Sequence, residues 1–346
     1  MNEGTDSVPI FFLMTKIRFG IIGFGAFAER AILPAIRAAE HAVVTMIQKR
    51  SMDAARAKAE EHSVPFYCDS VEALVSHPEV DAVFIVSSND QHHPATLLAA
   101  AHGKHVLVEK PMAVSLKQAQ EMAEACRTAG VKLMVAHMLR FSPLIRRMKE
   151  IVQSGMIGRV TYARSHFFYN ANYSQRKWLW DPVTAGAGPL FDIGIHCLDT
   201  MRYVLNDERV RTVRSIMHPS PGSGHVEGTS VLSLGFESGT LATIHSSYEQ
   251  NFRESYIEFM GTEGNIAASQ FSPSNTDTHI DIIRGVEGRR ENVVQEPFHV
   301  HDLYTMEVED LALSIIEQRE PYIPVAEALH NQEILEKAMN DAKITL

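Results

Sequence analysis

Two side chains in the middle of the chain have types and a spacing that suit acid–base chemistry. Asp192 and His196 follow a glycine-rich stretch, residues 185–189, and are four positions apart. On a helix this spacing puts the carboxylate and the imidazole on one face, where both can reach one bound hydroxyl group. A histidine with an ordinary pKa can take the proton of that hydroxyl while the aspartate orients the substrate. The pair is a candidate catalytic site, although such a helix pair taken alone is more often structural.

A third candidate, Lys110, stands at the end of a predicted strand. It follows the apolar run His105–Val108, with Glu109 before it and Pro111 after it. Because proline cannot continue a strand, Lys110 lies at the strand's carboxyl end, which is the edge where ligands bind in open α/β sheets. A lysine at that edge can donate a hydrogen bond to a substrate oxygen.

The glycines near the start of the chain indicate a bound dinucleotide. The run Ile17–Ile22 leads into Gly23-Phe24-Gly25-Ala26-Phe27-Ala28 and then into a helical pattern, which is the context that the G-x-G-x-x-G/A fingerprint requires. Gly23 permits the tight turn, Gly25 lets the backbone approach a pyrophosphate, and Ala28 lets helix and strand pack closely. We therefore expect these residues and Phe27 to bind a nicotinamide cofactor.

The residues after the second predicted strand favour NADP over NAD. An NAD-preferring site carries an acidic residue there to hold the ribose hydroxyl, whereas this chain has Lys49 and Arg50, followed by Ser51. A guanidinium and an ammonium suit the 2′-phosphate of NADP. NAD is the alternative: Asp53 would serve if the register slipped, and the two cations would then belong to a solvated loop.

Two patterns of elements must position these groups. In residues 17–140, β-branched runs alternate with helical patterns, as in a doubly wound parallel sheet. After residue 140 the strand-like stretches alternate in polarity and contain glycine turns, which indicates a mostly antiparallel sheet. The predicted strands are 17–22, 43–47, 80–86, 105–108, 133–136, 159–169, 210–217, 230–236, 240–245 and 255–259; the predicted helices are 27–39, 52–61, 94–102, 116–129, 141–152, 189–205, 303–318 and 325–342.

The fold class is therefore α/β, with two domains. Residues 16–140 form a Rossmann dinucleotide-binding domain, and residues 141–346 form an α+β domain with a large, open, mostly antiparallel sheet, which binds the substrate and forms oligomers. The final helices are candidates to pack back on the Rossmann domain. Residues 1–15 form an N-terminal extension, in which Met14 is an alternative start.

Six motifs occur in one order along residues 17–342: the glycine run, His92-His93-Pro94, residues 103–111, Arg140-Phe141-Ser142-Pro143, Gly155-Met156-Ile157-Gly158 and residues 178–199. This order resembles the Gfo/Idh/MocA oxidoreductases, the group that contains glucose-fructose oxidoreductase and inositol 2-dehydrogenase. The resemblance implies that Lys110 is the catalytic lysine, and that Asp192 and His196 are the family's aspartate and histidine. We also expect a set of residues to border the cofactor: Ser87, Asn89, His92, Glu109, Lys110 and Arg140.

The predicted function is hydride transfer between NADP(H) and a secondary alcohol or carbonyl group of a sugar, cyclitol or related polyol. Two alternatives use the same fold. One is a glycoside-active enzyme that keeps NAD bound and oxidises its substrate transiently, and the other is a redox-inactive NAD(P)-binding sensor or regulator. The presence of Lys110, Asp192 and His196 argues against the sensor.

Composition excludes several other classes. The 346 residues carry a formal net charge of −10, so no global positive field attracts nucleic acid or an acidic membrane. No apolar run approaches the roughly 20 residues that a bilayer demands. Three scattered cysteines give neither a disulfide framework nor a zinc pattern and fit the cytoplasm. The paired histidines at 92–93 and 299–301 lack a third ligand, so we expect no metal.

A second copy of the chain is the expected partner. The predicted strands at 161–169, 230–236 and 240–245 form a sheet with too few helices to cover both faces. An exposed apolar sheet face normally finds a partner. We expect a homodimer or homotetramer joined through the C-terminal sheet.

Overall fold

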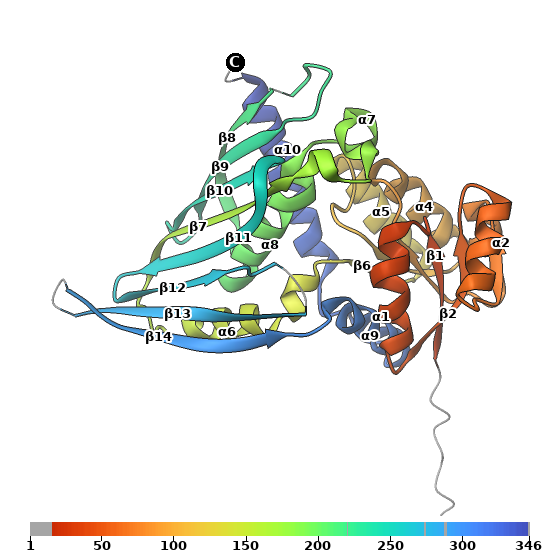
Figure 1. The fold of residues 1–346 in the computed structure, drawn as a ribbon, viewed down its shortest axis with the longest axis horizontal. Coiled ribbons are helices and arrows are strands. Elements are labelled where there is room, and N and C mark those ends of the chain that lie inside the picture. Colours follow the sequence, from red (N-terminus) through yellow and green to blue (C-terminus); the bar gives the residue numbers. More distant parts are fainter. Residues whose placement is uncertain (1–15, 220, 273–274, 287–288, 345–346) are drawn as a thin grey trace, which may run out of the picture.

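The computed structural model describes residues 16–344 except 220, 273–274 and 287–288, and it contains two sheets (Figure 1). The first sheet has six parallel strands in the order β3-β2-β1-β4-β5-β6. Its strands are β1 (Ile17–Ile22), β2 (Ala42–Gln48), β3 (Phe66–Cys68), β4 (Ala82–Ile85), β5 (His105–Val108) and β6 (Leu133–Val135). This order is that of a Rossmann sheet, and it confirms the prediction.

Helices cover both faces of this sheet, which explains why its central strands are apolar without alternation. They are α1 (Leu33–Ala38), preceded by the π-helical turn η1 (Ala28–Ile32), α2 (Met52–Glu61), α3 (Val71–Val75), α4 (Asn89–Ala101) and α5 (Leu116–Ala129). Serine side chains cap three of them: Ser51, Ser70 and Ser115 accept backbone N–H groups at 3.2–3.4 Å. Helix α4 begins at Asn89, five residues before the predicted start, and contains Pro94.

The second sheet has eight strands in the order β14-β13-β12-β11-β7-β10-β9-β8. They are β7 (Val160–Asn170), β8 (Val210–His218), β9 (Thr229–Phe236), β10 (Leu241–Ser247), β11 (Glu249–Gly261), β12 (Gly264–Ser269), β13 (Thr276–Val286) and β14 (Arg289–Val300). All neighbours are antiparallel except β7 and β10. A hairpin at Ser238 and Gly239 joins β9 to β10, and Gly239 has a φ of +88°. The sheet is thus mostly antiparallel, as predicted. The sequence did not predict the strands β12, β13 and β14.

The main helical segments after β6 pack on one face of the second sheet, against the first sheet or against other helices (Figure 1). They are η2 (Met138–Phe141), α6 (Pro143–Gln153), α7 (Pro182–Ala185), η5 (Leu190–Gly194), α8 (Ile195–Val204), α9 (Leu303–Ile316) and α10 (Val325–Ile344). Helix α8 packs on β7 and α10 on β8, while α9 contacts α1, β1 and β5. Helix α10 therefore connects both sheets, because it also contacts α5 and β6, whereas α9 packs on the first sheet. None of the described helices has the length and apolar character needed to cross a bilayer.

Candidate active site

Lys110 and Asp192 meet where the two sheets approach each other. Lys110 lies just beyond the end of β5, and Asp192 lies in η5, immediately before α8. The Lys110 Nζ donates a hydrogen bond of 2.7 Å to the Asp192 main-chain oxygen and lies 3.3 Å from Asp192 Oδ1. Both side chains are largely buried. The structure therefore brings together two of the three predicted catalytic residues, which are 82 positions apart.

Two further side chains bind the Asp192 carboxylate. Arg176 donates to both oxygens at 3.1 Å, and the Tyr169 hydroxyl donates to Oδ2 at 2.8 Å. Burial alone would raise the pKa of Asp192, but the charges of Arg176 and Lys110 and these hydrogen bonds hold that pKa well below its usual range. Asp192 is therefore a carboxylate at every ordinary pH, and it orients two cations.

His196 lies on α8, about one helical turn beyond Asp192, and is buried. Its ring is 6.2 Å from that of Phe167, and it forms no hydrogen bond with any residue that the structure describes. Burial, and then the charge of Lys110, lowers the pKa of His196 well below its usual value. The sequence suggested an ordinary pKa; the structure instead disfavours the charged form, so the ring is neutral at pH 7.

A buried carboxylate fixes the start of the helical segment that carries these residues. Glu227 accepts the backbone N–H groups of Gly188 at 2.8 Å and Leu190 at 3.1 Å, as an N-cap does. A Cβ on Gly188 would lie 2.1 Å from the Glu227 carbonyl oxygen, so only glycine fits there. Sequence reasoning missed Glu227 because it is isolated in the chain and has no motif around it.

The glycine loop has the shape that a pyrophosphate needs. Gly23 has a φ of +84°, and a Cβ there would lie 2.8 Å from Ser87 Cα. Gly25 faces open space, since the nearest atom to its Cβ position is 3.8 Å away. Gln48, which sequence reasoning did not select, holds the loop by accepting the N–H of Gly23 at 3.1 Å through Oε1 and that of Phe24 at 2.9 Å through its carbonyl. These residues fit a dinucleotide.

Lys49 and Arg50, in the loop after β2, differ in whether their side chains are bound to the protein. Strand β2 ends at Gln48, so Lys49 and Arg50 follow it directly. Lys49 Nζ donates to the Phe24 carbonyl at 2.6 Å, and burial lowers its pKa. Arg50 is exposed. Asp53, the alternative ribose ligand, lies on α2 and forms an exposed ion pair with Arg56 at 3.0 Å.

Two predicted cofactor contacts have another role. His92 is fully buried; its Nδ1 lies 2.9 Å from the Pro111 carbonyl and its Nε2 3.3 Å from that of Ser87. Burial lowers the pKa of His92 to about 4, so the neutral ring ties the loop after β4 to the turn after Lys110. Asn89 donates to the Ala185 carbonyl at 2.8 Å. Both side chains thus connect loops of the site, and their contact with a cofactor stays a prediction.

Arg140 is also not at the cofactor loop. Its side chain is buried, binds Asp199 on α8 at 2.7–3.1 Å and lies 2.9 Å from Asp207. A buried arginine with two carboxylate partners has no free face for a phosphate. Arg140 therefore connects η2 to α8, and its predicted contact with the cofactor stays a prediction.

The other predicted cofactor residues surround the glycine loop and the end of β5. Ala28 is buried in the core, as close packing of helix and strand requires. The Phe27 ring packs edge-on against Tyr304 of α9 at 5.6 Å. Glu109 Oε2 accepts the backbone N–H of Lys110 at 3.2 Å. The Ser87 hydroxyl is buried without a partner among the described residues.

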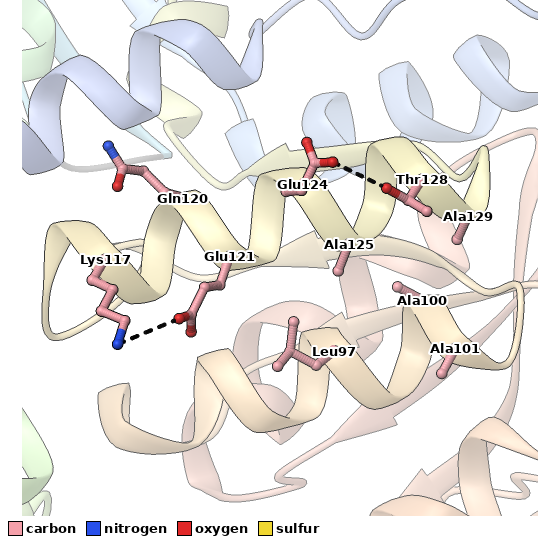
Figure 2. A pocket seen from close by; sticks show the side chains of 10 residues that line it. All are labelled: Leu97, Ala100, Ala101, Lys117, Gln120, Glu121, Glu124, Ala125, Thr128 and Ala129. Atoms are coloured by element: carbon pink, nitrogen blue, oxygen red, sulfur yellow. Dashed lines mark hydrogen bonds and ion pairs between the residues drawn. The ribbon is translucent and has the colours of Figure 1, made fainter.

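A groove on the outer surface, between α4 and α5, contains none of these residues (Figure 2). Small side chains form its floor, and Lys117, Glu121 and Glu124 stand along α5 beside it. No acid–base pair or glycine loop faces this groove. The chemistry is therefore concentrated at the junction of the two sheets.

Comparison with known proteins decides the family. The model for the Gfo/Idh/MocA oxidoreductase family with an NAD-binding Rossmann fold matches residues 17–137, and that for the family's C-terminal domain matches residues 145–267. A 1,5-anhydro-D-fructose reductase from Ensifer adhaerens is 38% identical over 250 residues, or 72% of this chain and 74% of that protein. The chain belongs to the Gfo/Idh/MocA oxidoreductase family. The resemblance seen in the sequence is confirmed, and the protein is an oxidoreductase with an NAD(P)-binding fold.

Other relatives show the range of the family. A D-xylose 1-dehydrogenase (NADP(+)) from Haloferax volcanii is 30% identical, covering 86% of this chain and 88% of that protein. The crystal structure of an aldose-aldose oxidoreductase from Caulobacter crescentus superposes with a TM-score of 0.84 at 24% identity, covering 96% of this chain and 98% of that one. Similar folds have been solved with NADP and with NADH.

Proposed function

We propose that this protein is an NADP-dependent dehydrogenase or reductase of a sugar or related polyol. The observation that carries the proposal is the joint placement of Lys110 and Asp192, hydrogen-bonded to each other, with neutral His196 one helical turn away. The similar 1,5-anhydro-D-fructose reductase and D-xylose 1-dehydrogenase support the substrate class. A sensor without redox activity would not need this arrangement of proton-handling groups.

Each residue has a distinct role in this proposal. NADP, when bound, supplies the carbon that accepts or delivers the hydride. His196 takes the proton of the substrate hydroxyl in oxidation and returns it in reduction, because burial keeps its ring neutral. Lys110 Nζ donates a hydrogen bond to the reacting oxygen. Asp192 holds Lys110 in place by accepting its hydrogen bonds. Asp192 thus has a positioning role, whereas its residue type alone suggests a contact with the substrate.

The cofactor preference rests on the loop after β2. Gly23 and Gly25 would hold the pyrophosphate, and Arg50 would bind the 2′-phosphate. Lys49 is anchored to the glycine loop by its bond to Phe24, so it would contribute charge from a fixed position. Since Asp53 is directed to Arg56, no acidic side chain of this loop competes for a ribose hydroxyl, which favours NADP over NAD.

A cofactor reduction screen tests the proposal. Purified protein is mixed with NADP⁺ or NAD⁺ and a panel of sugars, cyclitols and diols, while absorbance reports reduced cofactor and a thermal shift reports binding. We expect NADPH formation with at least one polyol. Binding of cofactor without any reduction would point to a regulator, and conversion of a glycoside without net NADPH would point to transient oxidation by bound NAD.

The second sheet supports assembly into a homodimer or homotetramer. Helices α6, α8 and α10 pack on one of its faces, while the other exposes large apolar side chains, among them Ile216 at 64%, Leu241 at 60% and Val231 at 43% exposure. A shallow depression on this sheet is lined by Arg164, His166, Thr243 and His245. An apolar face of this kind is typical of an interface between copies.

The three free cysteines are buried and fit a cytoplasmic protein.

A further inference from the structure

Glu227 is a buried acid to which the proposed reaction gives no part. It lies before β9, is only 2% exposed, and accepts the N–H groups of Gly188 at 2.8 Å through Oε2 and of Leu190 at 3.1 Å through Oε1. Pro189, between them, has no N–H group. The Glu227 carboxylate therefore accepts every backbone N–H group of residues 188–190, at the start of the segment that carries Asp192.

Further hydrogen bonds continue from this segment to Lys110. The Gly188 carbonyl accepts the N–H of Asp192 at 3.2 Å, and the Asp192 carbonyl accepts the Lys110 Nζ at 2.7 Å. Three consecutive hydrogen bonds thus lead from the Glu227 carboxylate to the Lys110 ammonium, through the main chain of Gly188 and Asp192. The acid and the lysine come from different domains, and η5 connects them.

The main chain beside Glu227 is itself fixed. The N–H of Gly228 donates to the His218 carbonyl at the end of β8, and the Gly228 carbonyl accepts the N–H of Tyr248, directly after β10; both bonds are 2.8 Å long. On the other side, a Cβ on Gly188 would lie 2.1 Å from the Glu227 carbonyl oxygen. Glu227 is therefore a short link between the second sheet and the start of η5.

Loss of this carboxylate would disturb the first turn of the segment more than the rest. The N–H groups of Gly188 and Leu190 are buried, and a buried N–H group without an acceptor is costly. The turn would then shift to find other acceptors, and the Asp192 carbonyl would move with it. His196 lies farther along, on α8, which packs on β7, so its position depends less on Glu227.

We propose that Glu227 is a positioning residue for Lys110, and that it acts through the main chain of Gly188 and Asp192. It keeps the Asp192 carbonyl where Lys110 Nζ donates to it, and so fixes where the ammonium meets the reacting oxygen. This inference rests on the proposed role of Lys110. Burial raises the pKa of Glu227, while the two N–H bonds oppose that rise, as expected for a buried acid bound by backbone donors.

Chemical labelling of the full chain tests the link without any substrate. Acetic anhydride acetylates lysine side chains, and mass spectrometry of peptides gives the rate for each lysine. Lys104 is the internal standard, because its Nζ also donates to a main-chain carbonyl, that of Val80, at 2.7 Å. In Glu227→Gln the amide oxygen accepts only one N–H group and the NH₂ faces the other. Labelling of Lys110 relative to Lys104 should therefore rise by about threefold or more.

Glu249→Gln is the matched control for this measurement. Glu249 is exposed, and its Oε1 lies 2.6 Å from the position of a Cβ on Gly228, so the same chemical change is made next to Glu227 without removing its bonds to η5. This variant should keep the wild-type labelling ratio. An unchanged ratio in Glu227→Gln, or the same rise in Glu249→Gln, would overturn the proposal.

Turnover tests whether Glu227 acts through Lys110. With the polyol found in the screen, kcat of Glu227→Gln should fall about tenfold, while the Kd for NADPH stays within about twofold. Added to Lys110→Met, the same change should lower turnover by less than about twofold, because the group that Glu227 positions is already missing. A purely structural role would lower turnover by the same factor in both backgrounds, which contradicts the positioning role.

The test remains decisive when a variant or the substrate fails. If Glu227→Gln does not fold, Glu227→Asp takes its place: it keeps the carboxylate but is one methylene group shorter, so it cannot reach both N–H groups from the same main chain. The labelling of Lys110 relative to Lys104 should again rise, and a wild-type ratio would overturn the proposal. If no polyol is oxidised, the proposed function fails, while the labelling still decides the role of Glu227.

Discussion

Asp192 shows how the surroundings of one residue change its role. Its type and its distance from His196 suggested a group that holds substrate, yet Lys110, Arg176 and Tyr169 occupy both of its carboxylate oxygens. These donors lie 82, 16 and 23 positions away. A local pattern identifies such a carboxylate, but it cannot show which distant donors reach it, because Tyr169 lies on β7 and Arg176 lies in the connection beyond it, and only the packing of these elements brings them to Asp192.

The buried side chain of His92 leads to a prediction about how the stability of the protein depends on pH. Burial lowers the pKa of His92 from 6.5 to about 4, so below pH 6.5 the unfolded chain takes a proton that the folded chain refuses, and stability is lost as the pH falls. From pH 7.5 to pH 5.5 the unfolding free energy of the wild type should fall by about 1.4 kcal/mol relative to His92→Asn. Urea titrations at both pH values measure this difference, and a difference that does not change with pH would contradict it.

Among the elements, those with a strong local signal were predicted well. β1, α2, β5 and α5 have the predicted bounds, because capping serines and apolar runs mark their ends. The hairpin β13–β14 was missed because its strands are largely polar and pair mainly with each other. Helix α4 was predicted to begin at Pro94, since proline favours the first turn, but the chain becomes helical at Asn89.

The loop after β2 carries the prediction for cofactor choice. Arg50 is exposed directly after the strand, so Arg50→Asp should weaken NADPH binding by at least tenfold and favour NADH, because a carboxylate repels the 2′-phosphate and can accept a ribose hydroxyl. Fluorescence titration with both cofactors measures the change.

Arg127→Asp is the control for that experiment, since Arg127 is exposed on α5, away from the loop after β2, and pairs with Glu124. It should leave the preference between the cofactors nearly unchanged. Wild-type protein that binds NADH as tightly as NADPH would show that Arg50 does not read the 2′-phosphate.

At the scale of the whole molecule, the two sheets have different tasks. The Rossmann sheet presents the glycine loop and Lys110, and the second sheet supports η5 and α8, which carry Asp192 and His196. Helix α10 contacts both sheets, through β8 and β6, whereas α9 packs on the first sheet. The last helix therefore links the two halves of the site.

The exposed face of the second sheet makes a prediction about assembly. Leu241 on β10 is 60% exposed in the single chain, and Leu241→Asp should convert a dimer or tetramer to a smaller species, because a buried unpaired charge opposes association. Light scattering at micromolar concentration measures the mass. Val183→Asp, at an exposed position on α7, is the control and should leave the mass unchanged; a wild-type monomer would contradict the prediction.

The central claim is that His196 exchanges the proton while Lys110 holds the reacting oxygen. The most direct test is the rate of NADPH formation by His196→Ala, compared with the wild type on the polyol found in the screen, with cofactor binding followed in parallel. The account predicts that turnover falls by roughly 100-fold or more, the usual scale for an acid–base group, while the Kd for NADPH stays within about twofold, since His196 belongs to neither phosphate subsite. Turnover close to that of the wild type, with the cofactor bound normally, would contradict the account.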